Sequence, residues 1–223
     1  MVRLNKFLAE RLGVSRREAD ELISRGSVTV NGEPAILGEP IDKTSKVCYN
    51  GKIVPFETVF SYILLNKPPG YVCSRRAQGE APTIYSLLPE NLVRLKTVGR
   101  LDKDSAGLIL LTDDGDFAFA MTHPKFHKHK TYIVELDRDL EPLHQQMIAD
   151  FGVELTDGVS RLGLTRLSSR RQWQVEMSEG RNRQIRRTFG ALGYTVVGLE
   201  RVLFGPYELG DLQPGEWREV EKL

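Results

Sequence analysis

The feature that most constrains the fold is an abrupt change of character between residues 98 and 116. Here a charged turn, GRLDKDS at residues 99–105, runs into a wholly apolar stretch, LILL at 108–111. A short apolar stretch bounded by turn-forming residues is typical of a strand buried in a sheet. The pattern therefore predicts a buried strand at 108–112 that carries a charged turn at its start.

The rest of this half of the chain alternates between strand and helix patterns. Strand patterns occupy 61–72, 130–136 and 173–179, and helix patterns occupy 142–152 and 182–193. In the last helix Ile185, Phe189 and Leu192 share one face, and Gly193 marks its end. The mixture predicts an α/β domain over residues 58–223, built on a mixed, mainly antiparallel sheet.

The first part of the chain has the pattern of a small domain with two helices and a hairpin. The first helix has an apolar face made of Leu4, Phe7, Leu8 and Leu12. The second begins with SRRE at 15–18, which is a capping box. Asn31-Gly32 then predicts a tight hairpin turn. We place this domain at 1–46 and a linker at the turn-rich segment 47–57, so that the whole chain is expected to be α+β.

Composition sets few limits on function. The chain has 223 residues, a formal net charge of +1 and 27% charged residues, so only local clustering of basic residues could favour a nucleic-acid partner. The two cysteines, Cys48 and Cys73, form no metal-binding or disulfide pattern and are expected to be free thiols. The apolar stretches are too short to span a bilayer and the N-terminus lacks an apolar signal core, so we expect a cytoplasmic protein without membrane contact.

Motifs for common cofactors are missing from the sequence. It contains no GxxxxGK[ST] or GxGxxG loop and no GxSxG elbow. His127 and His129 alternate with lysines and lack a carboxylate partner, which favours a solvated or phosphate-facing segment over a metal site. The acidic cluster DDGD at 113–116 fits a turn and helix cap better than a calcium loop. We therefore expect neither cofactor nor metal.

The segment RLNKFLAERLGVSRREADELISRGSVTVNG, residues 3–32, resembles an S4 domain, a small RNA-binding module. The resemblance implies binding to structured RNA through backbone and shape contacts. The candidate RNA-binding residues of this domain are Arg3, Lys6, Arg16 and Arg17. Acidic residues lie among them, so by charge alone a simply solvated face is the alternative.

Four further segments, taken in order, resemble the motifs of the RsuA-type ribosomal RNA pseudouridine synthases. They are LLNKPPGYVCS at 64–74, GRLDKDSAGLILLT at 99–112, KTYIVEL at 130–136 and EGRNRQIRRTFGALGY at 179–194. Together with the S4 domain, the resemblance covers essentially the whole chain. It implies an enzyme that isomerises uridine to pseudouridine within ribosomal RNA, without a cofactor.

The resemblance assigns roles to the residues that match these motifs. Asp102 is the implied catalytic carboxylate, and Arg186 is implied to pair with it, since a fixed positive charge keeps a carboxylate ionised where a base excludes water. Tyr132 is implied to stack on the uracil and to help remove its C5 proton. Ile185 packs near the base, and Arg100 helps to replace the flipped nucleotide. Whether Asp102 attacks C6, attacks C1′ or assists at C2′ stays open.

The remaining expected substrate contacts come from the same motifs. Arg181, Arg183 and Arg187 are expected to hold RNA phosphates. Lys67 is grouped with the substrate-contacting residues, although support of the active-site loop is its expected role.

Several alternatives remain at this level. The motifs slightly favour 16S small-subunit rRNA over 23S large-subunit rRNA as the substrate. A non-catalytic RNA chaperone or ribosome-assembly factor is a second possibility, which the presence of Asp102, Tyr132 and Arg186 disfavours. A glycosidase using Asp102 and Asp104 is a third, disfavoured because two residues in one tight turn do not flank a sugar. The protein is expected to be a monomer.

Overall fold

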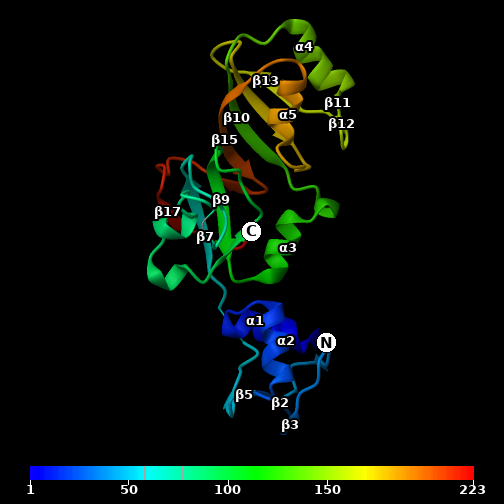
Figure 1. Cartoon of the computed structure of the whole chain (residues 1–223), viewed down its shortest axis with the longest axis vertical. Helices are drawn as coiled ribbons and strands as arrows, with labels where there is room; N and C mark the ends of the chain where they lie inside the picture. Colours follow the sequence, from blue (N-terminus) through cyan, green and yellow to red (C-terminus); the bar gives the residue numbers. More distant parts are fainter. Residues whose placement is uncertain (58, 77) are drawn as a thin grey trace. The chain divides into compact units, whose positions relative to one another are not determined.

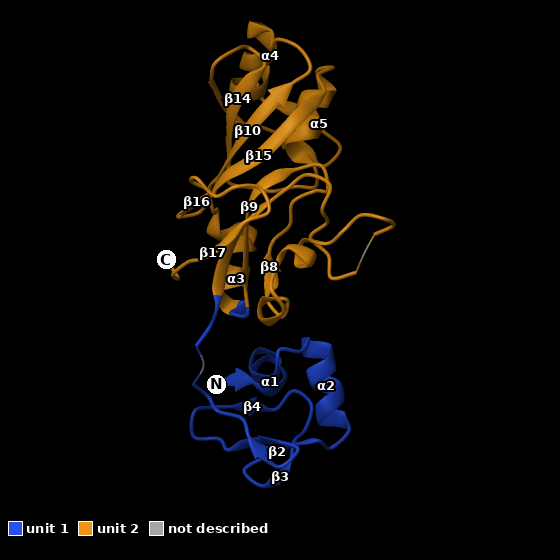
Figure 2. Cartoon of the chain, turned by 90° about the vertical axis from the view of Figure 1, so that its left-hand side faces the viewer, with its two compact units in different colours: residues 1–61, 113–115 blue, residues 62–112, 116–223 orange. Residues whose placement is uncertain are grey.

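The computed structural model describes residues 1–57, 59–76 and 78–223. The chain divides into two compact units, of which the smaller comprises 1–61 with 113–115 and the larger comprises 62–112 with 116–223 (Figure 2). The predicted start of the larger domain, residue 58, lies outside the described residues. Each unit has its own hydrophobic core.

The smaller unit packs two helices against short strands (Figure 1). Its elements are β1 (Val2–Arg3), α1 (Leu4–Leu12), α2 (Arg16–Ser24), β2 (Val28–Val30), β3 (Glu33–Pro34), β4 (Pro40–Ile41), β5 (Val47–Tyr49) and β6 (Lys52–Ile53). Strands β3, β2, β5 and β6 form one sheet in that order, and β1 pairs with β4.

The local predictions for this unit are confirmed. The Ser15 hydroxyl accepts a hydrogen bond from the Glu18 amide at 3.1 Å, and the Glu18 carboxylate accepts one from the Ser15 amide at 2.6 Å, which completes the capping box. Asn31 and Gly32 have φ angles of 54° and 94°, so both centre residues of the hairpin turn are left-handed, as a tight turn between twisted strands requires.

The placement of the linker at 47–57 needs correction. Residues 47–53 form β5 and β6, which belong to the sheet of the smaller unit. Val47 is buried in the core of that unit, and its neighbours Cys48 and Tyr49 are half-buried. The strand pairs are only two or three residues long, which is too short for a period-two pattern to separate them from turns.

The larger unit is built on one twisted sheet, in which β13, β14, β10, β15, β9, β7 and β17 follow one another (Figure 1). Its strands are β7 (Tyr62–Lys67), β8 (Lys96–Val98), β9 (Ala106–Thr112), β10 (Lys130–Leu136), β11 (Val153–Leu155), β12 (Gly158–Ser160), β13 (Gly163–Arg166), β14 (Gln172–Met177), β15 (Val196–Phe204), β16 (Tyr207–Glu208) and β17 (Trp217–Glu219). Its helices are η1 (Ile84–Leu87), η2 (Glu90–Leu92), α3 (Gly115–Thr122), η3 (Pro124–Phe126), α4 (Pro142–Gln146) with its continuation η4 (Met147–Phe151), and α5 (Gln184–Ala191).

The pairing confirms the predicted mixed, mainly antiparallel sheet. Among the described strands, β9 and β15 form the one parallel pair, and the other pairs are antiparallel. The helix pattern at 142–152 is observed as α4 and η4, and the pattern at 182–193 as α5. None of the helices in the described ranges has both the length and the apolar character that crossing a bilayer demands.

The apolar run at 108–111 lies in β9, an interior strand of this sheet. Leu108, Ile109, Leu110 and Leu111 in β9 are all at most 1% exposed. Leu108 and Leu110 pack in one core cluster with Phe117 and Met121 of α3, whereas Ile109 and Leu111 pack in the other cluster with residues of α5. Both faces of β9 are therefore covered, which is why its sequence lacks polar alternation.

Gly107 allows the parallel pair to form. It has a φ of +99°, and a Cβ there would lie 2.3 Å from the carbonyl oxygen and 2.7 Å from the amide nitrogen of Arg201 in β15. Only glycine adopts this conformation without strain while letting two backbones approach so closely.

Gly107→Ala is therefore expected to destabilise the larger unit by about 2–4 kcal/mol, through left-handed strain and forced separation of the strands. Denaturant unfolding measures the loss. Gly190→Ala is the matched control, because Gly190 lies in α5 and an added Cβ would meet no described atom within 4 Å. Equal stability of the two variants would contradict the role given to Gly107.

Candidate active site

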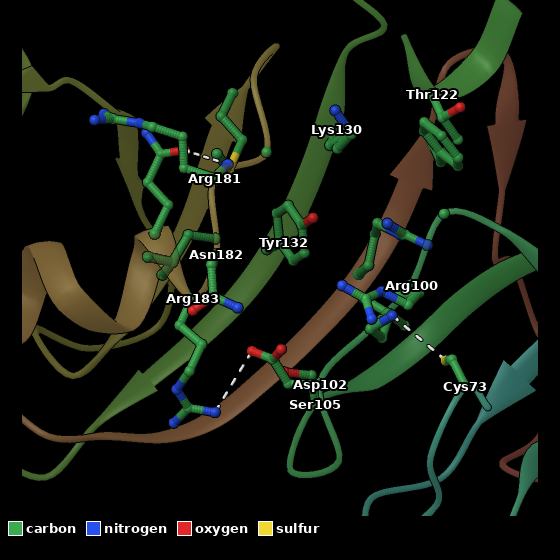
Figure 3. Close-up of a pocket in the computed structure, with 18 of the residues that line it drawn as sticks. Cys73, Arg100, Asp102, Ser105, Thr122, Lys130, Tyr132, Arg181, Asn182 and Arg183 are labelled. Carbon is green, nitrogen blue, oxygen red and sulfur yellow. Dashed lines mark hydrogen bonds and ion pairs between the residues drawn. The ribbon is translucent and has the colours of Figure 1, made fainter. Parts of the chain in front are cut away.

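A cavity of about 700 Å³ opens on the larger unit at the start of β9 (Figure 3). Its walls come from the loop 99–105, from β10 and β15, from the end of α3, and from the segment 177–186 that leads into α5. These segments are far apart in the sequence, and the sheet brings them together because β10, β15 and β9 are neighbours.

A buried lysine holds the loop before β9 in place. Lys67, at the end of β7, is 0% exposed, and its ammonium group donates hydrogen bonds to three carbonyl oxygens. Two of them belong to Lys103 and Ser105 of the loop, at 3.1 and 2.6 Å. Burial lowers the pKa of Lys67, while Cys73, Asp104 and Asp102 oppose that shift. The grouping of Lys67 with substrate-contacting residues is therefore corrected, because its ammonium group is buried and hydrogen-bonded to carbonyl oxygens of the protein.

Asp102 lies on this loop at the cavity wall, with its side chain 33% exposed. Its carboxylate is 3.5 Å from a guanidinium nitrogen of Arg183, which reaches across from the segment before α5 (Figure 3). Arg183 itself has a left-handed φ of 47°, and its side chain is 44% exposed. The carboxylate thus stays accessible from the cavity while a positive charge is held beside it.

The expected ion pair between Asp102 and Arg186 is not the one observed. Arg186 donates hydrogen bonds to the carbonyl oxygens of Val196, at 2.7 Å, and Asp104, at 3.0 Å. It therefore braces the backbone of the loop rather than the carboxylate. Burial and Arg183 lower the pKa of Arg186, and the nearby charges of Asp104 and Asp102 raise it. A guanidinium has five N–H donors, which backbone carbonyl oxygens can accept from as well as carboxylates. The sequence alone does not show which of these acceptors lies within reach.

An apolar and aromatic wall faces Asp102 in the same cavity. Tyr132 of β10 is 8% exposed and its ring borders the cavity (Figure 3). Ile185 and Leu199, which are 4% and 9% exposed, line the cavity and belong to the same core cluster as Tyr132. Such a surface suits a planar heterocycle, which can stack on the ring with one edge toward the carboxylate.

The three arginines expected to hold phosphates have different partners. Arg187 binds the Asp157 carboxylate through two nitrogens at 3.0 and 2.7 Å, and Arg181 binds the same carboxylate at 3.1 Å. Arg181 also donates to the carbonyl oxygens of Gly158 and Val159. Hydrogen bonds from Arg187 lower the pKa of Asp157. These two arginines tie the β11–β12 turn to the segment 181–187, and Arg183 remains open to a ligand. Contacts of Arg181 and Arg187 with phosphates stay a prediction.

The other predicted contacts fall in two places. Arg100 is exposed at the cavity wall (Figure 3). In the smaller unit Arg3, Arg16 and Arg17 are exposed, whereas the Lys6 ammonium lies 3.9 Å from the Glu10 carboxylate on the next turn of α1. Within the described residues no three His, Cys, Asp or Glu side chains converge as metal ligands.

Two cavity residues escape the sequence analysis. Lys130 begins β10 two positions before Tyr132, and burial, followed by the charge of Arg201, lowers its pKa to about 8. Arg201 is opposite Tyr132 on β15 and is only 3% exposed. Period two along 130–132 places Lys130 on the face of Tyr132, a signal available from sequence. Arg201 had no such signal, because its face depends on the strand register.

Comparison with known proteins gives a consistent result. The family model for RNA pseudouridylate synthase matches residues 61–191, and that for the S4 domain matches residues 2–43. The chain is 40% identical to the ribosomal small subunit pseudouridine synthase A of Pasteurella multocida, over 98% of this chain and 96% of that protein. It is 37% identical to the protein of the same name from Escherichia coli, over 98% of this chain and 96% of that protein. A crystal structure of a pseudouridylate synthase superposes with a TM-score of 0.70 at 34% identity, covering 99% of this chain and 96% of that chain.

Asp157→Ala is expected to loosen the segment that carries Arg183 without unfolding the domain, because two arginines lose their shared anchor. Amide hydrogen exchange over 181–187 should become about ten-fold faster, while the thermal midpoint hardly changes. Asp139→Ala is the control, since Asp139 also forms an ion pair with an arginine, Arg171, but a more exposed one outside this segment. Unchanged exchange in Asp157→Ala would show that the segment is ordered without this anchor.

Proposed function

The chain belongs to the RNA pseudouridine synthase family, in the branch with an N-terminal S4 domain, and from this premise we propose that it modifies a specific uridine of small-subunit ribosomal RNA, with Asp102 as the catalytic carboxylate. The protein is a pseudouridine synthase. In this isomerisation the N1–C1′ bond of uridine breaks, the uracil turns, a C5–C1′ bond forms, the C5 proton leaves and N1 gains a proton.

The observation that carries the assignment of Asp102 is its position opposite Tyr132 in a cavity of nucleotide size. The described carboxylates that line the cavity are those of Asp102 and Glu179. Glu179 accepts hydrogen bonds from Gln184 and Arg181, so its oxygens are engaged. Among the described residues, Asp102 forms an ion pair with Arg183, and its side chain lines the cavity and is 33% exposed.

The geometry supports a division of labour during the reaction. The target uridine must leave its RNA stack, and the exposed Arg100 at the cavity wall is placed to fill the gap that it leaves. The ring of Tyr132 stacks on the uracil, and its hydroxyl group helps to remove the C5 proton in the last step. Asp102 supplies the anionic oxygen beside the reacting atoms, and Arg183 and Arg186 keep that oxygen and its loop in place.

The choice of RNA is supported by the relatives and by the smaller unit. Relatives at 37–40% identity over nearly the whole chain are named small-subunit enzymes, which favours 16S rRNA over 23S rRNA. Exposed Arg3, Arg16 and Arg17 suit contacts with phosphates of structured RNA. A monomer acting in the cytoplasm completes the proposal, and a purely non-catalytic assembly factor is disfavoured because the cavity unites Asp102 with Tyr132.

Asp102→Asn is expected to reduce kcat on the order of 1000-fold or more, about 4 kcal/mol of transition-state stabilisation, because the anionic oxygen is lost at almost constant shape. Tritium release from C5-labelled small-subunit rRNA measures the turnover. Asp104→Asn is the control, since this exposed acid lies in the same turn and uses its backbone carbonyl for Arg186. Equal losses in both variants, or turnover retained in Asp102→Asn, would remove Asp102 from the proposed role.

The double variant Arg16→Gln, Arg17→Gln is expected to raise KM for rRNA while leaving kcat unchanged. Loss of two phosphate contacts should lower the slope of log affinity against log salt by about one to two. Arg25→Gln is the control, because Arg25 is ion-paired with Glu21 at 3.4 Å on the same helix. Identical salt slopes in both proteins would contradict RNA binding by this helix.

A further inference from the structure

Arg201 is a buried cation that lacks a counter-charge in the part of the chain that the structure describes. Its side chain is 3% exposed, and its Nε donates a hydrogen bond to the Leu108 carbonyl oxygen at 2.8 Å. Its Nη2 is buried and has no hydrogen-bond partner among the described residues. A buried guanidinium with an unmade hydrogen bond is costly, and the cost falls when a ligand supplies the missing acceptor.

The Arg201 side chain faces the cavity beside Tyr132. Arg201 lines the cavity, and it is the cross-strand partner of Tyr132 in the pairing of β15 with β10. Cross-strand partners extend from the same face of a sheet, so both side chains serve the same cavity. The guanidinium carbon also lies 4.7 Å from the centre of the Phe204 ring, and this cation–π contact helps to hold the Arg201 side chain in position.

Positive charge gathers on this side of the cavity. Lys130, Lys128 and Arg100 line it together with Arg201. The Lys130 ammonium donates to the carbonyl oxygens of Lys128, Ser178 and Glu179 at 3.2–3.4 Å, which are neutral acceptors. The cavity carboxylates do not balance these charges, because Asp102 pairs with Arg183 and Glu179 binds Arg181 and Gln184.

We propose that Arg201, supported by Lys130 and Lys128, forms an anion subsite that binds a phosphate group flanking the target uridine. The subsite rests on the proposed RNA substrate, but neither on the catalytic role of Asp102 nor on which RNA is modified. A phosphate carries the negative charge that would balance these cations, and two of its oxygens can accept hydrogen bonds from one guanidinium. The phosphates are attached to the ribose whose base stacks on Tyr132. Arg201 lies beside Tyr132 on the neighbouring strand β15, so it is placed to bind one of these phosphates.

A purely structural role accounts for only part of these observations. The hydrogen bond from Nε to Leu108 connects β15 to β9 and would be made whether or not a ligand binds. It gives no reason for an Nη2 that is buried and unpaired, nor for three further cations around it. An apolar side chain of similar length would hold the strands at lower cost.

The test compares four probes on the full-length protein: uridine, its 5′-phosphate, its 3′-phosphate and uridine 3′,5′-bisphosphate. Titration by NMR should show that the bisphosphate binds about ten-fold or more tightly than uridine, since one charge-assisted pair is gained. Arg201→Met should remove that preference while retaining the affinity for uridine, and Arg201→Lys should keep part of it. The monophosphate that loses affinity in Arg201→Met identifies the phosphate concerned. Arg166→Met, at an exposed site in β13, is the control and should keep the full preference.

Two further arms separate this proposal from the others. Asp102→Asn should keep the phosphate preference and lose turnover, so failure of the catalytic assignment leaves the subsite standing. If Arg201→Met does not fold, Arg201→Gln, which keeps a donor and loses the charge, replaces it. Phosphates that add nothing to uridine binding in the parent protein overturn the proposal. A phosphate preference that survives in Arg201→Met also overturns it. The same holds if Arg201→Met loses as much affinity for uridine as for the phosphates, because Arg201 would then contact the nucleoside.

Discussion

The site depends on one buried interaction, the ammonium group of Lys67 beneath the loop 99–105. Burying a charge is expensive unless it is well coordinated, and here three carbonyl oxygens coordinate it. Because two of those carbonyls belong to Lys103 and Ser105, the same bonds that make the buried charge tolerable also fix the loop. Asp102 and Asp104 lie close enough to favour the charged form of Lys67. The loop aspartates and the lysine therefore stabilise each other, and a catalytic carboxylate gains a rigid mount.

The arginines around the cavity are chemically identical, and their partners distinguish them. Arg181 and Arg187 share the carboxylate of Asp157 and tie a hairpin to the segment before α5. Arg186 holds the loop backbone, and Arg183 stands beside Asp102. Arg201 alone is both buried and without an acidic partner in the described residues. Arg181 and Arg187 bind a carboxylate of the protein, whereas Arg201 binds none in the described residues and is available to an anionic group of the substrate.

Local chemistry in the sequence was enough for several elements, but not for the pairing of charges. The capping box at Ser15, the Asn31-Gly32 turn and the buried strand at 108–112 follow from interactions within a few residues, or from burial on both faces, and the structure confirms them. The partners of Arg186, Arg181 and Arg187 are set by tertiary distances, so the sequence did not reveal that Arg186 binds loop carbonyl oxygens or that the other two bind Asp157. The strands at 47–53 were missed because such short pairs acquire their structure from their neighbours.

The same register that makes the fold possible also aligns the site. At Gly107 the β9 backbone approaches Arg201 more closely than any side chain would permit, and the parallel pairing of Glu200 with Ala106 and of Arg201 with Gly107 fixes both strands. The loop bearing Asp102 enters β9 at that point, and the Arg201 side chain leaves β15 at the same level. A shift of one residue in this pairing would turn Arg201 to the other face of the sheet and move the loop away from Tyr132. One glycine therefore couples the stability of the sheet to the relative placement of Asp102 and Arg201.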